Sequence, residues 1–239
     1  MEIIYEDSDV IVVNKEAGLP VQAGRASEKD LISELKNHLA KTGEKEPYLG
    51  IVHRLDQPVE GLVVFAKNNP SASDLSRQVR AKSAGGSEKS CSDMRKAYQA
   101  VVLVPDEKAL KLAEYAKTHV VTLQDTLLRR YSDNTTVVVP EGVKGAKDAE
   151  LTFRTLSIWK EPEGTEKALL EIHLHTGRHH QIRVQMANAG LPLDGDRKYG
   201  PSGMKYSYNI RLCAYELRFR HPATGKKMKF QITPSFIRQ

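Results

Sequence analysis

The spacing of hydrophobic residues predicts a protein built mainly from β-strands. Short runs rich in β-branched residues, several with alternating apolar and polar positions, are typical of strands. Such runs cover residues 98–104, 135–139, 151–158, 168–174 and 212–219. Near the N-terminus, residues 3–5 and 10–13 flank Asp7-Ser8-Asp9 with the spacing of a short hairpin. The segment HPATGKK, with its proline and glycine, predicts another hairpin near the C-terminus.

Helical spacing appears in residues 30–41, 71–82 and 179–189. The last of these segments ends before Gly190, which is placed as a C-terminal cap. Its apolar stripe is formed by Ile182, Met186 and Ala189, and this spacing places Arg183 away from the buried face. Because helices and strands do not alternate strictly, we expect an α+β fold with a mixed, mostly antiparallel central sheet flanked by helices and loops.

Composition and charge narrow the class of protein. With 239 residues and 40% hydrophobic side chains, the chain is too ordinary in composition to be fibrous or disordered. It has neither a run of roughly 20 apolar residues nor a basic and then apolar leader, so we expect a cytoplasmic protein with no membrane partner. Cys91 and Cys213 lack the spacing of a zinc or redox site and are expected to be reduced thiols. The net charge of +6 favours a polyanion such as nucleic acid, although many basic proteins bind none.

The segment GIVHRLDQPVEGLVVFAK carries the strongest candidate for chemistry. Pro58 and Gly61 mark a loop that leads into the apolar strand 62–66, and loops at the ends of rigid strands suit active sites. In this loop Arg54 stands two positions before Asp56. A carboxylate can act as a covalent nucleophile when it is ionised and oriented, and a nearby guanidinium favours both. Taken alone, the same pair of residues is more often a surface ion pair or a turn former.

Four segments, in the family's order, resemble the motifs of the large-subunit (RluA-type) pseudouridine synthases. They are VHRLDQPVEGLVVFAKN, KAYQAVV, HLHTGRHHQIRVQMANAGLPLDGDRKYG and RLCAYELRFRHPATGK. The resemblance covers nearly the whole chain and implies the pseudouridine synthase fold, with an RNA-binding cleft, as a single catalytic domain over residues 1–239. Because strand structure is predicted within the first few residues, we expect no separate N-terminal RNA-binding domain.

The resemblance also implies a role for each matching residue. Asp56 matches the aspartate that attacks the target nucleotide covalently, at the uracil ring or at the ribose C1′. Arg54 matches the arginine that fills the gap left by the flipped nucleotide. Tyr98 matches the tyrosine that packs on the flipped uracil, and Arg183 matches the basic residue that pairs with the catalytic carboxylate. Without the resemblance, Tyr98 would be interpreted as a core residue and Arg183 as a solvated helix residue.

Residues around the start of the last predicted helix are candidates for RNA-backbone contacts. Arg178, His180 and Gln181 follow Thr176-Gly177, where they either bind a phosphate or cap the helix. The histidines nearby have no carboxylate in a recognised metal pattern with them, so no metal is assigned. Residues 81–93, rich in Gly and Ser, form either a clamp that orders on RNA or an idle connection. Lys96, Lys226, Lys227 and Lys229 either extend a basic rim for the RNA backbone or are simply solvated, as lysines at hairpin tips usually are.

The chain departs from the commonest family pattern at Val59-Glu60, where relatives have Thr-Ser, and Glu60 is expected to repel a nearby phosphate. The implied partner is structured RNA, either ribosomal or transfer RNA. The implied reaction needs no cofactor and no obligatory protein partner, and a monomer suffices for it. Two other functions also fit these residues. One is an RNA-binding protein that keeps the fold but acts without catalysis, and the other is a glycoside hydrolase that uses Asp56 with Glu60 or Asp196.

Overall fold

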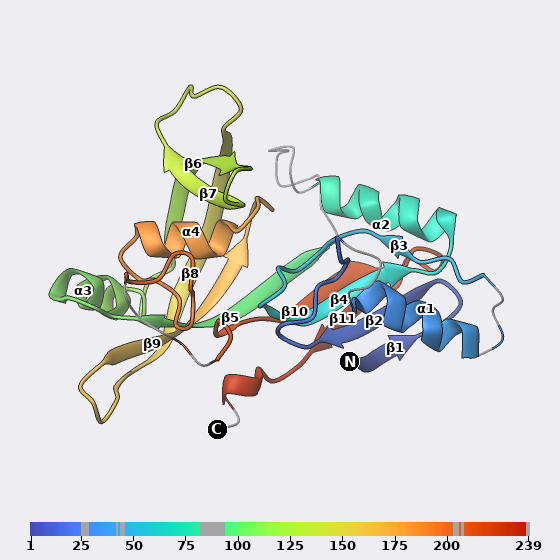
Figure 1. Ribbon diagram of the computed structural model, residues 1–239, viewed down its shortest axis with the longest axis horizontal. Helices are drawn as coiled ribbons and strands as arrows, with labels where there is room; N and C mark the ends of the chain where they lie inside the picture. The colour runs from blue at the N-terminus through green and yellow to red at the C-terminus, as the bar shows by residue number, and fades with distance from the viewer. Residues whose placement is uncertain are drawn as a thin grey trace. The chain divides into compact units, whose positions relative to one another are not determined.

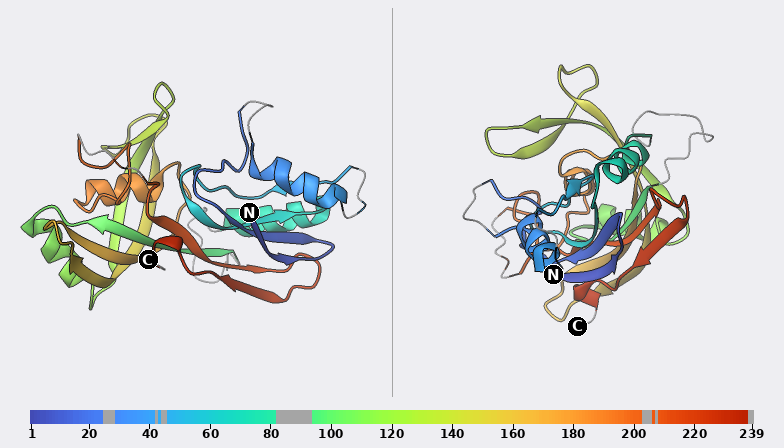
Figure 2. Two further views of the ribbon diagram at one scale, coloured as in Figure 1. Left: turned by 60° about the horizontal axis from the view of Figure 1, so that its bottom comes forward. Right: turned by 90° about the vertical axis from the view of Figure 1, so that its right-hand side faces the viewer.

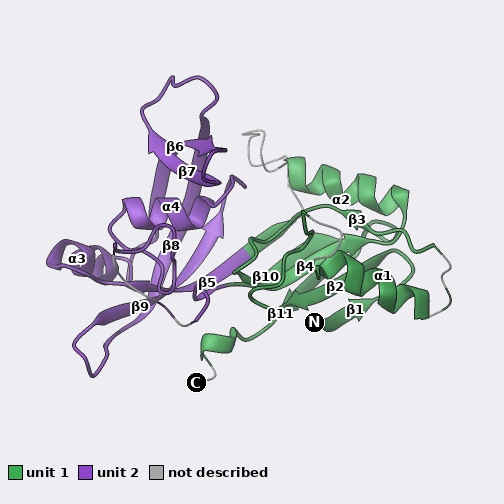
Figure 3. Cartoon of the chain, in the orientation of Figure 1, with its two compact units in different colours: residues 1–96, 213–239 green, residues 97–212 purple. Residues whose placement is uncertain are grey.

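The chain forms two compact units that are described separately (Figure 3). The structure is a computed structural model, and it describes residues 1–24, 29–41, 43, 46–81, 94–202, 206 and 208–237. Unit 1 consists of residues 1–96 and 213–239, and unit 2 consists of residues 97–212. The predicted single domain over residues 1–239 stays a prediction, because two compact units can belong to one domain.

Unit 1 is a mainly antiparallel sheet with two helices (Figure 1). Its strands are β1 (Glu2–Glu6), β2 (Val10–Lys15), β3 (Gly50–Ile51), β4 (Glu60–Ala66), β10 (Leu212–Arg220) and β11 (Lys227–Gln231). The strands follow the order β1-β2-β4-β10, with β3 paired to β4 and β11 paired to β10. All these pairs are antiparallel except β4 with β10, which is parallel. The helices are α1 (Leu31–Lys41) and α2 (Asn69–Ala81), and a 3₁₀ turn, η2, covers Ser235–Ile237.

The sheet of unit 1 is buried on both faces. Val12 of β2 and Val64 of β4 belong to the same hydrophobic cluster as Leu75 of α2. Their neighbours Ile11 and Val13 point to the opposite face, because side chains alternate along a strand, and they are equally buried. Helix α1 lies beside the β1–β2 hairpin (Figure 2) and buries Leu31, Leu35 and Leu39. The loop that carries Asp56 is therefore attached to a rigid, fully covered strand.

Unit 2 is an antiparallel sheet with the order β5-β9-β8-β6-β7. Its elements are β5 (Arg95–Leu103), α3 (Glu107–Tyr115), β6 (Val121–Arg130), β7 (Thr135–Val139), β8 (Lys147–Lys160), β9 (Glu166–Leu174) and α4 (Gln181–Asn188). The predicted α+β class with a mostly antiparallel sheet is confirmed. Strand β6 was not predicted, because it is mostly accessible to solvent: of its ten residues only Leu127 is buried.

One prediction about α4 is wrong. The apolar stripe places Arg183 away from the buried face, yet Arg183 is only 5% exposed. Each residue from Gln181 to Met186 is buried, so this helix has no solvated face over that stretch. A buried guanidinium is tolerated when it is paired and hydrogen-bonded, and the structure supplies such a partner, Asp196. The predicted cap is confirmed, since Gly190 follows the helix with a φ of 83°.

Two sequence predictions fall on residues that the structure does not fully describe. The candidate clamp at 81–93 lies outside the described residues after Ala81, and so does Cys91. Cys213 is buried and is a free thiol, as predicted. In the part of the chain that the structure describes, no helix has the length and apolar character needed to cross a membrane.

Candidate active site

The loop that carries Asp56 is anchored by every second residue. His53 and Leu55 are buried, whereas Arg54 is exposed and Asp56 is half-buried. The His53 Nε2 atom accepts a hydrogen bond of 3.2 Å from the backbone N–H of Val64, which ties the loop to β4. Burial, followed by the charge of Lys96, holds the pKa of His53 well below its ordinary value, so the ring is neutral and can accept this bond. The anchored loop leaves its charged residues closer to solvent than the residues between them.

A buried lysine lies beneath this loop. Lys15, the last residue of β2, is 0% exposed, and its ammonium donates hydrogen bonds to the backbone carbonyls of Glu16 (3.0 Å), Leu19 (2.8 Å) and Gln57 (3.1 Å). The loop after β2 and the Asp56 loop are thus held by the same ammonium group. Burial lowers the pKa of Lys15 to about 8, while the negative charges of Asp56 and neighbouring glutamates act in the opposite direction. Lys15 therefore supplies a fixed positive charge close enough to Asp56 to interact with it.

Gly61 lets two backbones meet directly behind the loop. Its φ is +128°, and a Cβ atom at this position would lie 2.5 Å from the backbone nitrogen of Ala214, the residue with which it pairs in β10. Gly61 is also the cross-strand partner of Lys15. Any larger residue would both strain the backbone and push β4 away from β10. The glycine after Val59-Glu60 is therefore required by close packing of the sheet.

The lowered pKa of Lys15 predicts a pH dependence of stability. Between about pH 8 and its ordinary pKa of 10.5, the folded chain loses the Lys15 proton while the unfolded chain keeps it. Because the unfolded state then binds more protons, the contribution of this residue to stability rises with pH in that window, by at most about 1.4 kcal/mol per unit. Urea unfolding of the wild type and of Lys15→Met, measured across the window, checks this. The free energy of unfolding of the wild type should rise relative to that of the variant as pH rises. A difference that stays constant across the window would contradict the lowered pKa of Lys15.

Unit 2 holds a second set of candidate residues around Arg183. The guanidinium donates two hydrogen bonds to Asp196, from Nε to Oδ2 (2.8 Å) and from Nη2 to Oδ1 (2.7 Å). Both side chains of this pair are buried. The same Asp196 carboxylate accepts the backbone N–H groups of Lys198 and Tyr199. The Arg183 Cζ atom also lies 5.1 Å from the centre of the Tyr199 ring, so both the position and the plane of the guanidinium are fixed.

His180 is part of a buried, neutral network. Its Nδ1 atom is 2.8 Å from the hydroxyl of Tyr199, and that hydroxyl accepts the backbone N–H of Thr136. Which of the two side chains donates the proton in this contact depends on the tautomer of His180. Burial, and then the charge of Arg183, lower the pKa of His180 to about 3. At neutral pH His180 is uncharged, so any phosphate contact that it makes has to come from a neutral ring.

Gln181 and Arg178 shape the turn before α4. The Gln181 Oε1 atom accepts hydrogen bonds from the hydroxyl of Thr176 and from the backbone N–H of Arg178. Its amide nitrogen donates to the carbonyl of Glu150 and to Gln185. Gln181 thus orders the turn that precedes α4, whereas the N-cap residue of this helix, His180, makes no side-chain capping hydrogen bond. Arg178 is half-buried, and its Nε atom donates to the carbonyl of Asp148.

Tyr98 lies on β5 opposite Ile172 of β9 and is buried. The predicted residues of unit 2 lie on three segments: Tyr98 is on β5, Gln181 and Arg183 are in α4, and Arg178 and His180 lie in the turn directly before that helix. Arg54 and Asp56 belong to unit 1. The predicted residues are thus divided between the two units, and the roles taken from the family resemblance stay predictions.

The glycosidase interpretation finds little support in the carboxylates that it requires. Glu60 accepts the backbone N–H of Ser235 (2.8 Å), and Asp196 is engaged by Arg183. Lys15 and the Arg183–Asp196 pairing were both missed by sequence reasoning. A signal for Lys15 exists in the sequence, because it ends the run VIVVNK, in which every second position is apolar and faces the same side of the strand as the lysine.

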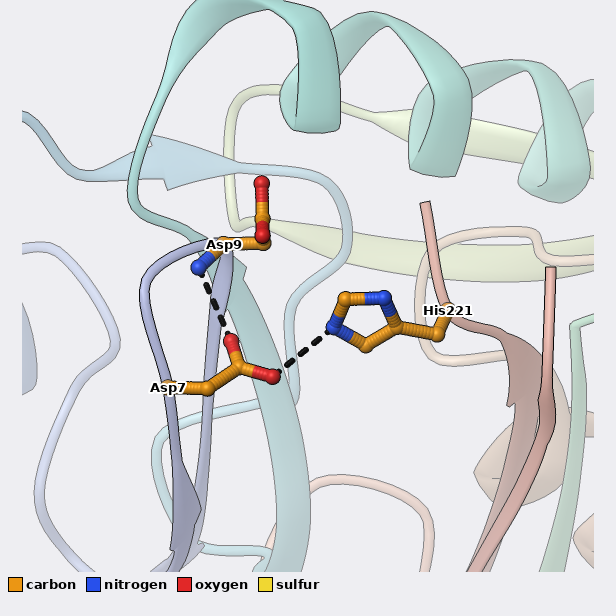
Figure 4. Close-up of side chains that lie close together, drawn as sticks. All are labelled: Asp7, Asp9 and His221. Atoms are coloured by element: carbon orange, nitrogen blue, oxygen red, sulfur yellow. Dashed lines mark hydrogen bonds and ion pairs between the residues drawn. The ribbon is translucent and has the colours of Figure 1, made fainter. Parts of the chain in front are cut away.

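A group of metal-ligand residue types lies at another edge of unit 1. Asp7, Asp9 and His221 place ligand atoms within 4.8 Å of one another. Figure 4 shows the Asp7 carboxylate between the His221 ring, at 2.8 Å, and the backbone N–H of Asp9. The Asp9 carboxylate in turn accepts bonds from Asn68 and Ser71. These hydrogen bonds join the β1–β2 turn to α2 and to the turn after β10, and they account for all three side chains.

Comparisons with known proteins agree with this architecture. The family model described as RNA pseudouridylate synthase matches residues 9–188. An uncharacterized RNA pseudouridine synthase of Aquifex aeolicus is 32% identical, over 97% of this chain and 69% of the relative. Ribosomal large subunit pseudouridine synthase D of Vibrio cholerae is 31% identical, over 96% of this chain and 66% of the relative. The chain thus spans about two thirds of the length of these curated relatives.

Solved structures show the same fold. The human RNA pseudouridylate synthase domain-containing protein 1 has a TM-score of 0.74 at 20% identity, over 98% of this chain and 84% of that one. The human domain-containing protein 4 has a TM-score of 0.71 at 22% identity, over 98% of this chain and 89% of that one. The match to the family model covers well over half of the chain, including the Asp56 loop and α4. This chain belongs to the RNA pseudouridylate synthase family.

Proposed function

We propose that this chain isomerises uridine to pseudouridine in structured RNA, with Asp56 as its covalent catalyst. The proposal rests mainly on the way the Asp56 loop is fixed. The buried Lys15 ammonium donates a hydrogen bond to the carbonyl of Gln57, and the neutral His53 ring accepts one from β4. A nucleophile needs a fixed position and a stabilised negative charge, and both are favoured by a buried cation nearby. The family model matches residues 9–188, a range that includes this loop.

The reaction exchanges one bond to the ribose for another. In the ribose route, an Asp56 oxygen bonds to C1′ and the bond between C1′ and the base nitrogen breaks, with its electron pair going to the uracil. The uracil turns, its C5 atom bonds to C1′ and displaces the carboxylate, and the C5 proton is lost to a base while the former glycosidic nitrogen takes up a proton. In the alternative route, Asp56 attacks the uracil ring first. Nothing is oxidised, reduced or hydrolysed overall, so the reaction balances without a cofactor.

The remaining roles follow from the target's position in folded RNA. A stacked uridine is inaccessible, so it must be extruded and its place filled, and the exposed Arg54 suits the second task. Tyr98 would pack on the extruded uracil, and Arg183 would stabilise the negative charge of the catalytic carboxylate, which is the role of the matching residue in the family. Ribosomal RNA is the first substrate class to examine, because relatives are named as ribosomal large subunit synthases. We further propose that the chain works in the cytoplasm as a monomer.

An activity assay with purified protein tests the proposal. The full chain is incubated with transcribed ribosomal and transfer RNA, and pseudouridine is mapped by carbodiimide modification. We expect the treated RNA to keep its mass and to contain carbon-linked uracil at one or a few positions. Tight RNA binding without any pseudouridine would favour a binding protein that lacks catalysis. Release of a free base or sugar would favour a hydrolase.

A further inference from the structure

A buried ionic cluster outside the proposed catalytic set lies in unit 2. Asp194 is 0% exposed, and its Oδ2 atom lies 3.2 Å from the Lys167 ammonium and 3.6 Å from the Arg211 guanidinium. Lys167 is also buried, and its second partner is Glu161, at 3.3 Å. A carboxylate removed from water in this way is stabilised by its two cations, and its Oδ2 atom has no hydrogen-bond partner among the described residues. Asp194 is therefore a fixed anchor.

The anchor holds an aromatic residue at the surface. The hydroxyl of Tyr208 donates a hydrogen bond of 2.8 Å to Asp194 Oδ1. The Arg211 Cζ atom lies 5.0 Å from the centre of the Tyr208 ring, and the Tyr206 ring meets it at 5.5 Å with an angle of 62°. Even so, 37% of Tyr208 stays exposed. The hydroxyl bond and the adjacent guanidinium already hold this ring in place. It therefore loses little conformational entropy when a flat ligand stacks on it.

Close backbone packing brings Tyr208 to this position. Gly195 has a φ of +82°, and a Cβ atom there would lie 2.7 Å from the carbonyl oxygen of Asn209. The backbone N–H of Arg211 donates to the carbonyl of Asp194, which fixes the same two segments to each other. Asp196, the partner of Arg183, follows directly after this glycine. The Tyr208 ring is thus built on the same short segment that positions Arg183.

We propose that Tyr208, supported by Arg211 and Tyr206, is a stacking platform for an unpaired nucleobase that flanks the target uridine. The inference rests on the proposed function, since it takes RNA as the ligand. Exposed aromatic rings combined with arginine are a common way to bind single-stranded RNA, because every base offers a flat face. Arg211 adds positive charge beside the ring, which suits the neighbouring phosphate. If the role of Tyr208 were only to donate a hydrogen bond to Asp194, the hydroxyl would matter and the exposed face of the ring would not.

Two substitutions separate these roles. Tyr208→Phe and Tyr208→Ala both remove the hydroxyl that bonds Asp194, but only the alanine removes the ring. The full chain is titrated with a fluorescein-labelled, single-stranded oligoribonucleotide of mixed sequence, and the anisotropy gives Kd. A second probe, the same oligomer with 2-aminopurine in place of its adenines, reports stacking by loss of fluorescence. Tyr208→Ala should bind roughly 5- to 100-fold more weakly than Tyr208→Phe, which follows from the usual strength of base–aromatic stacking.

A matched control is Tyr115→Ala, which removes another exposed tyrosine of unit 2, at the end of α3. This variant should bind as the wild type does, and Tyr208→Ala should quench 2-aminopurine less than Tyr208→Phe. Equal Kd values for the two Tyr208 variants, or equal loss in the Tyr115 variant, would overturn the platform. The carbodiimide assay on the wild type separates the two ideas. If the wild type forms pseudouridine but the two Tyr208 variants have equal Kd values, only the stacking platform is wrong. If the wild type forms no pseudouridine, the proposed function is wrong, whatever the Kd values of the Tyr208 variants.

Discussion

Replacing Asp56 with asparagine should reduce pseudouridine formation at least about 1,000-fold, because the amide has no negative charge with which to attack carbon. The change keeps the size of the side chain, so the loop should stay folded on the Lys15 ammonium and on His53. Single-turnover assays on the RNA that the wild type modifies measure the effect. RNA affinity should change little, since the loss concerns a bond formed during the reaction.

The control for this variant is Asp74→Asn in α2, another half-buried aspartate of unit 1. It bonds Arg77 and Gln78 on its own helix and should leave turnover unchanged. Circular dichroism and thermal melting show whether each variant is folded. An Asp56→Asn protein that is folded and still modifies RNA at the wild-type rate would remove Asp56 from the mechanism.

The second large effect is expected at Arg183. Replacing it with methionine removes the guanidinium and leaves the buried Asp196 carboxylate without this ion pair. Removing one partner of a buried ion pair typically lowers the free energy of unfolding by about 3–5 kcal/mol. Replacing it with lysine keeps the charge but loses the planar fork that makes both bonds, so we expect a smaller loss of about 1–3 kcal/mol. Urea unfolding measures both values. Turnover of the lysine variant should also fall, because the guanidinium is the group proposed to stabilise the catalytic carboxylate.

Arg154→Lys is the matched control, since Arg154 pairs with Glu171 in the same unit but is itself exposed. An exposed pair contributes about 0–1 kcal/mol, so this variant should be nearly as stable as the wild type. Equal stability losses in the Arg183 and Arg154 variants would show that burial of the Arg183–Asp196 pair has no energetic consequence. Unchanged turnover in Arg183→Lys would exclude a fork-dependent role in catalysis.

Local pattern was enough to predict most of the elements of this fold. Leu31, Leu35 and Leu39 bury one face of α1, and the hairpins at both ends of the chain form where turn residues separate apolar runs. Patterns fail where an element buries few apolar residues. Helix α3 buries only Ala109 and Ala113, and β6 carries mostly polar residues. Both elements are stabilised by neighbouring strands, which the local sequence pattern does not reveal.

The candidate site was predictable only in part. Asp56, Arg54 and their loop were recognisable because the chemistry and the motif lie within a few residues. Long-range pairing is different: Arg183 and Asp196 are 13 positions apart, and Lys15 bonds Gln57 from 42 positions away. Side chains that are buried through such partners have no signature in a stripe of hydrophobic residues. This is why α4, buried over its polar residues as well, was predicted with the wrong exposed face.

The most direct test of the central claim is pseudouridine mapping on total cellular RNA by carbodiimide chemistry. Cells with the wild-type gene are compared with deletion cells, and with deletion cells that express either the wild-type protein or Asp56→Ala. The account predicts that one or a few pseudouridines disappear on deletion, return with the wild-type gene and stay absent with Asp56→Ala. The account would be contradicted if no site disappeared on deletion, or if the sites that disappear returned with an expressed Asp56→Ala protein.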